Sequence, residues 1–163
     1  MNFVVIGTDH RMQHAEPGLK GLLQAWMERT FIEPLTAVAE EFHENIGDTS
    51  VAQELARERQ LDWFNLDMTD AEKATAGILE EQRNRPAPQE NIAYRVPSDE
   101  IREDAWVRKL VNAESGTRIV LCGYAHFESL VGRLHAGGHG VDKRVYLETV
   151  PTIVLAQPET QES

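Results

Sequence analysis

The sequence has one cysteine, no long apolar run and few basic residues, and each shortage excludes a class of protein. Cys122 is the single cysteine among 163 residues, so no intramolecular disulfide can form. No run of about 18 or more apolar residues is present, so we expect no membrane span. Lysine and arginine total 16 against 27 aspartates and glutamates, which gives a formal net charge of −11. Because so acidic a surface repels phosphate backbones and anionic lipids, nucleic-acid and membrane partners are disfavoured.

The common catalytic and nucleotide-binding signatures are also missing. The sequence has no glycine-rich phosphate loop, no GxSxG nucleophile elbow and no HExxH zinc motif. The apolar run at 3–6 is too short for a signal-peptide core and lacks a basic flank. We therefore expect a cytoplasmic protein.

Length and composition predict one globular domain. The hydrophobic fraction is 41% and the charged fraction 26%, both near the average for folded domains. Short apolar runs alternate with segments of helical periodicity, and five of these runs predict strands near 3–6, 35–41, 61–66, 118–122 and 141–147. Such alternation predicts a three-layer α/β/α fold with an open, mostly parallel sheet of about five strands.

The domain is expected to cover residues 1–156. The stretch from Arg83 to Pro97 is polar and contains three prolines, so it is predicted as a loop. Together with the short helix before it, this region at 67–97 is expected to be a mobile flap or an insertion. Residues 157–163 are polar and are predicted to form a disordered tail.

Two predicted strand ends share one pattern. Each apolar strand is followed by glycine, two further residues and histidine, in Gly7 to His10 and in Gly123 to His126. In an open parallel sheet, ligands bind outside the carboxyl ends of the strands, where both histidines are expected. His10 and His126 could therefore converge on one site, although two unrelated surface histidines remain an alternative.

A carboxylate is expected at the same edge of the sheet. The second predicted strand ends in Glu40 and Glu41, which cannot both point at one ligand because adjacent strand residues face opposite sides. His10, Glu40 and His126 suit a divalent metal (Mn, Co or Zn) with an open position for water. Alternatively, one histidine serves as a metal-free general base. Arg102 either orients an anionic substrate group, pairs with Glu40, or belongs to a surface charge network.

These motifs together resemble the Tiki/TraB family and its wider relatives, the erythromycin-esterase-like and ChaN-like proteins. Two segments resemble the twin GxxH motifs, and Val38 to Glu41 resembles the strand-end element in which Glu40 would be the family glutamate. Arg102 to Trp106 is similar to an Arg-Asn-x-x-Trp element, with Glu103 in place of asparagine, and 134–145 resembles the closing segment.

The resemblance implies an α/β/α fold and three different functions. It implies metal-dependent proteolysis for Tiki proteins, lactone hydrolysis for erythromycin esterases and haem binding for ChaN-like proteins. We therefore expect a small hydrolase acting on a peptide or ester bond of a small-molecule or peptide substrate. His10, Glu40, Arg102 and His126 would be its catalytic residues. A non-catalytic module that binds a small ligand or haem in the same cleft is the alternative, and a homodimer remains open.

Overall fold

The computed structural model describes residues 1–43 and 49–157, and a five-stranded parallel sheet forms its centre. The strand order is β3-β2-β5-β1-β6, and every neighbouring pair in this sheet is parallel. The strands are β1 (Asn2–Thr8), β2 (Leu35–Glu40), β3 (Asp62–Asn65), β5 (Thr117–Gly123) and β6 (Gly140–Tyr146). The predicted fold class is therefore confirmed.

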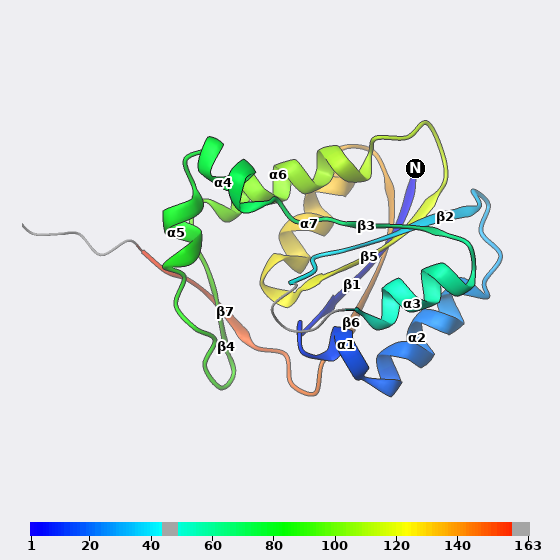
Figure 1. The fold of residues 1–163 in the computed structure, drawn as a ribbon, viewed down its shortest axis with the longest axis horizontal. Helices are drawn as coiled ribbons and strands as arrows, with labels where there is room; N and C mark the ends of the chain where they lie inside the picture. Colours follow the sequence, from blue (N-terminus) through cyan, green and yellow to red (C-terminus); the bar gives the residue numbers. More distant parts are fainter. Residues whose placement is uncertain (44–48, 158–163) are drawn as a thin grey trace, which may run out of the picture.

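Helices cover both faces of the sheet, with α2 and α3 on one side and α6 and α7 on the other (Figure 1). The four are α2 (Pro17–Met27), α3 (Val51–Glu58), α6 (Asp99–Leu110) and α7 (Tyr124–Ala136). The shorter helices are α1 (Met12–Ala15), α4 (Asp70–Thr75) and α5 (Leu79–Arg83). Within the described residues, no helix is long and apolar enough to cross a bilayer.

Two apolar cores lie on opposite faces of the sheet because strand side chains alternate. Val4 and Ile6 pack with α2 and α3, whereas Phe3 and Val5 pack with α6 and α7. Strands buried on both faces read as continuous apolar runs, which is why β1 was recognisable in the sequence.

Local caps fix where several helices begin. The Ser50 hydroxyl accepts the Gln53 backbone N–H at the start of α3, and Thr69 and Glu72 form a capping box at α4. The Ser-x-x-Gln and Thr-x-x-Glu patterns are typical of helix starts, because such side chains satisfy backbone donors that a helix start leaves free.

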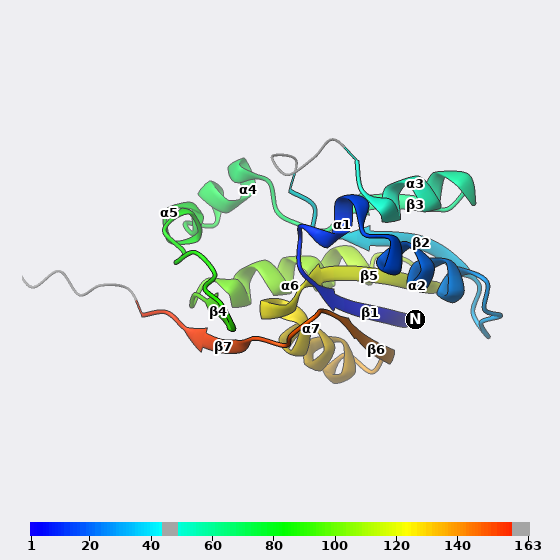
Figure 2. The same ribbon diagram turned by 90° about the horizontal axis from the view of Figure 1, so that it is seen from below.

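The segment at 83–97 differs from the predicted loop, because it contains the strand β4 (Ile92–Arg95), which pairs in parallel with β7 (Thr152–Leu155). The helices α4 and α5 precede it within the region at 67–97. This two-stranded sheet lies beyond the carboxyl edge of the main sheet (Figure 2). β4 was missed because a four-residue strand carries little periodicity, and its pairing with β7 spans about sixty residues of sequence. Of the predicted tail at 157–163, residues 158–163 lie outside the described residues.

Candidate metal centre

The carboxyl ends of β1, β2 and β5 bring three histidines around one buried carboxylate, that of Glu41. His10 Nε2 lies 3.4 Å from Glu41 Oε1, His43 Nε2 lies 3.5 Å from Oε2, and His126 Nε2 lies 3.7 Å from Oε2. The two GxxH histidines therefore converge on one site, as their position at neighbouring strand ends predicted.

The carboxylate at this centre belongs to Glu41 and not to Glu40. β2 ends at Glu40, and the backbone N–H of Glu41 still donates to Leu121 O, so the alternation of side chains continues through both residues. Ala39 and Glu41 face α6 and α7, whereas Val38 and Glu40 face α2 and α3. The placement of Glu40 among the metal ligands is therefore corrected by one residue.

Glu40 instead anchors a buried polar network on the other face. Its carboxylate accepts hydrogen bonds from the Ser50 hydroxyl, from Trp63 Nε1 at 2.8 Å and from Gln13 Nε2 at 2.8 Å. Gln13 Nε2 also donates to Glu41 O, which fixes the orientation of the amide. Gln13 Oε1 consequently accepts from His10 Nδ1 at 2.8 Å. Glu40 therefore acts on the site indirectly, by orienting His10 through Gln13.

His10, Glu41 and His43 form a group that could hold a metal ion. One ligand atom from each lies within 4.8 Å of the other two, and the two imidazole rings meet edge to face. Because Nδ1 of neutral His10 donates to Gln13, its Nε2 carries a lone pair that faces the carboxylate. Two acceptors that face each other need a proton or a cation between them. The expected ligand set of His10, Glu40 and His126 is thus replaced by His10, Glu41 and His43, and His126 lies beside this group.

His126 is held as a histidine–carboxylate pair. Its Nδ1 lies 3.0 Å from Glu103 Oε2, and Arg95 donates to both oxygens of Glu103. This arrangement fixes the tautomer, with the proton on Nδ1 and the lone pair of Nε2 directed toward Glu41 and Arg102. His126 lies in the first turn of α7 and packs against Trp106, so it is a buried residue and not part of a loop.

Arg102 is buried, which excludes the surface network considered for it. Its Nη2 donates to Glu41 at 2.8 Å and to Asp67 at 3.0 Å, its Nε donates to Asp67, and its Nη1 donates to Gln82. All three nitrogens are therefore engaged by the protein. The geometry gives Arg102 the task of orienting Glu41, with no free edge of the guanidinium for a substrate.

The shifts in pKa at Glu41 and His10 favour an ionised carboxylate and a neutral imidazole. Burial acts to raise the pKa of the Glu41 carboxyl, but interactions with His10 and His126, the His43 hydrogen bond and the charge of Arg102 hold it well below its ordinary value. Burial lowers the pKa of the His10 imidazole, against the opposing effect of Glu41. An ionised carboxylate beside a neutral imidazole is the pair of protonation states that metal ligation requires.

Only glycine at position 123 lets His10 and Glu41 pack closely against the end of β5. A Cβ atom at this position would lie 2.9 Å from His10 Nε2 and 3.3 Å from Glu41 Oε1, and the Gly123 backbone N–H donates to that same oxygen at 2.9 Å. Gly123 has φ −59°, which other residues also adopt, so the lack of a side chain and not the backbone conformation calls for glycine here. Gly7 is similar, since a Cβ there would meet the Phe127 ring at 2.8 Å.

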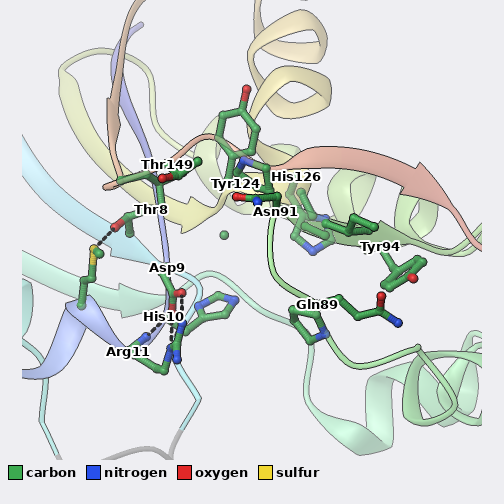
Figure 3. A pocket seen from close by; sticks show the side chains of 18 of the residues that line it. Thr8, Asp9, His10, Arg11, Gln89, Asn91, Tyr94, Tyr124, His126 and Thr149 are labelled. Carbon is green, nitrogen blue, oxygen red and sulfur yellow. Dashed lines mark hydrogen bonds and ion pairs between the residues drawn. The ribbon is translucent and has the colours of Figure 1, made fainter.

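A cavity of about 570 Å³ opens above the cluster. His10, Glu41, His43 and His126 line its floor, and the segment around β4 and the chain before β7 line the opposite wall. In Figure 3 His10 lies beside Asp9 and Arg11 on one side of this space, and Gln89 and Tyr94 lie across from it. The volume is within the range of sites that bind small molecules.

Sequence reasoning assigned no ligand or orienting role to three contributors to this site. His43 follows Glu41 by two residues, and a strand-end Glu-x-His could have signalled that both side chains share a face. Gln13 and Glu103 carry no such signal, because their roles depend on contacts with His10 and His126 across the fold. Comparison with protein-family models, curated proteins and solved structures finds no match to this chain, so its function is inferred from this geometry.

Proposed function

We propose that the chain is a metal-dependent hydrolase in which His10, Glu41 and His43 hold one divalent transition metal. The observation that carries the proposal is the convergence of these three ligand atoms on the floor of a cavity. Two imidazoles and one carboxylate form a ligand set used by catalytic zinc sites that keep a position open for water. A metal so bound polarises a carbonyl and lowers the pKa of water.

The ligand spacing fits such an ion. In a tetrahedral site with bonds of about 2.0 to 2.1 Å, ligand atoms are about 3.3 Å apart. His10 Nε2 lies 3.4 Å from Glu41 Oε1 and His43 Nε2 lies 3.5 Å from Oε2, which is close to that spacing for each histidine. With one ligand atom from each residue the three atoms lie within 4.8 Å of one another, so the group would contract around a bound ion. The Nδ1 bond of His10 to Gln13 supplies the outer-shell contact that orients ligating histidines.

The other residues of the site have separate tasks. The Nδ1–H of His126 is hydrogen-bonded to Glu103, which leaves Nε2 free to act as the base. His126 takes a proton from water at Nε2 and returns it to the leaving group. Arg102 and the Gly123 N–H hold the two oxygens of Glu41 in place. Of the four residues expected from the sequence, only His10 stays a metal ligand. His126, expected as a ligand, becomes the base, and Arg102 and Glu40 become positioning residues.

The resemblance to Tiki/TraB and erythromycin-esterase-like proteins supports the same class of reaction. The cavity wall mixes apolar side chains such as Pro88, Ile92 and Tyr94 with charged ones such as Glu90 and Arg85. The proposed substrate is accordingly a small molecule or short peptide with an ester or amide bond and an apolar part.

The test combines metal analysis with turnover. Purified protein is titrated calorimetrically with Zn²⁺, Mn²⁺ and Co²⁺, and it is assayed on nitrophenyl esters, lactones and short peptides with and without a chelator. One metal per chain is expected, with binding lost in His10→Ala and His43→Ala and kept in His135→Ala, which changes an exposed residue of α7.

Each alternative has its own signature in these assays. Hydrolysis that survives chelation and His43→Ala but not Glu103→Gln would replace the metal mechanism by a metal-free His126–Glu103 base, which the 3.0 Å contact between these residues favours. Hemin absorbance without turnover would favour the binding module.

A further inference from the structure

The two edges of the main sheet differ in a way that points to a partner. β3 at one edge has four residues, whereas β6 at the other has seven. Most β6 side chains are exposed, and Val145 is 42% exposed. Within the described residues β6 pairs with β1 alone, so its outer row of backbone N–H and C=O groups has no ladder partner there (Figure 2). A long exposed edge of this kind is a template for pairing with another strand.

The sequence of β6 is complementary to itself. Two copies related by a two-fold axis perpendicular to the sheet would pair their β6 strands antiparallel. When the axis passes through Lys143, all seven residues are paired. Val141 then lies opposite the partner's Val145, and Asp142 lies opposite the partner's Arg144. By symmetry each of these pairs occurs twice, so the edge would join two valine pairs and two ion pairs.

Contacts within one chain hold side chains in place on both faces of β6. Val141 and Lys143 lie on the α7 side, opposite Phe3 and Val5 of β1. On that side Lys143 Nζ lies 3.7 Å from Glu128 of α7, which offsets the repulsion of two lysines meeting at the axis. On the other side the Arg144 guanidinium lies over the Trp26 ring, 5.0 Å from its centroid, which limits its motion.

We propose that the protein forms a homodimer through antiparallel pairing of two β6 strands, which would join two five-stranded sheets into one of ten strands. Main-chain hydrogen bonds along the edge would supply affinity, and the Asp142–Arg144 pairs would set the register. The inference is independent of the metal centre, because no residue of β6 belongs to that cluster.

The test reverses charges at the proposed interface. Asp142→Arg or Arg144→Asp would place like charges opposite each other twice, which is expected to raise the dimer dissociation constant about tenfold or more. Analytical ultracentrifugation from about 1 to 100 μM measures the mass of each variant, and thermal unfolding checks that each is folded. The double variant Asp142→Arg/Arg144→Asp restores opposite charges and is expected to dimerise again.

Mixing the two single variants gives the sharpest result. Each variant alone is expected to dimerise weakly. An equal mixture places the two arginines of one variant opposite the two aspartates of the other and is expected to form a heterodimer. A monomeric wild type over this range would overturn the proposal. A wild-type dimer that ignores both single reversals, or single variants that do not associate when mixed, would also overturn it, because the contact would then lie elsewhere.

Discussion

Glu40 and Glu41 offer a matched pair of substitutions that separates a ligand from its neighbour. Both carboxylates are fully buried and adjacent in sequence, but they face opposite sides of the sheet. Glu41→Gln removes the charge between His10 and His43, whereas Glu40→Gln makes the same chemical change away from the cluster. The two variants are expected to differ in their response to metal.

The size of that difference can be estimated from mass action. A metal present at about 100 times its dissociation constant stabilises the native state by about 2.7 kcal/mol. For a chain of this size, about 1 kcal/mol corresponds to 2 to 4 °C in the unfolding midpoint, so the wild type should gain about 5 to 11 °C. If loss of the charged ligand weakens binding about 100-fold, Glu41→Gln should gain about 0.4 kcal/mol, or 1 to 2 °C.

Differential scanning fluorimetry with Zn²⁺, Mn²⁺ and Co²⁺ measures these shifts, each variant being compared with its own metal-free state. That comparison removes the cost of weakening the buried contact between Glu41 and Arg102. Glu40→Gln should keep most of the wild-type shift. Equal shifts in both variants would refute the assignment of Glu41 as the ligand, and no shift in the wild type would refute the metal site.

Three further predictions concern other residues. His126→Ala should lower the free energy of unfolding by about 2 to 4 kcal/mol in urea titrations, because a buried, hydrogen-bonded side chain is lost, whereas exposed His135→Ala should change it by less than about 0.5 kcal/mol. Gly123→Ala should abolish the metal-induced thermal shift, since its Cβ would lie 2.9 Å from His10 Nε2. The control Gly132→Ala adds its Cβ in open space on α7 and should stabilise the fold by about 0.5 to 1 kcal/mol. Burial acts to raise the pKa of Asp99, but hydrogen bonds and charge from Arg85 lower it overall, so its ionised form stabilises the fold above about pH 4 and this contribution fades at lower pH. The stability difference between wild type and Asp99→Asn should therefore be larger at pH 7 than at pH 3, and an unchanged difference would contradict this account.

The sequence was sufficient for the fold class and for the edge of the sheet that carries the site. Apolar runs such as 3–6 report burial on both faces, and their alternation with helical segments leaves few arrangements besides layered α/β. The positions of His10 and His126 after their strands followed from the rule that parallel strands end at one edge. These inferences hold because they depend on local periodicity and on chain direction.

Tertiary structure decided the rest of the site. The choice between Glu40 and Glu41 depended on which face of β2 points toward the site. Alternation places the two side chains on opposite faces but does not say which face α6 and α7 cover. From the sequence, Arg102 could orient a substrate, pair with Glu40 or join a surface charge network. Its partners Glu41 and Asp67 follow other strands, so only the folded structure identifies them.

The outer support of the site also lay beyond the sequence. Gln13 orients His10 and Glu103 orients His126 through contacts that join α1 to β2 and α6 to α7. Gln13 looks like an ordinary polar residue of a helix, and the place of Glu103 beside Arg102 in the sequence does not reveal its contact with His126. Their roles exist only where packing excludes water, because a buried polar group must then find its partner within the protein.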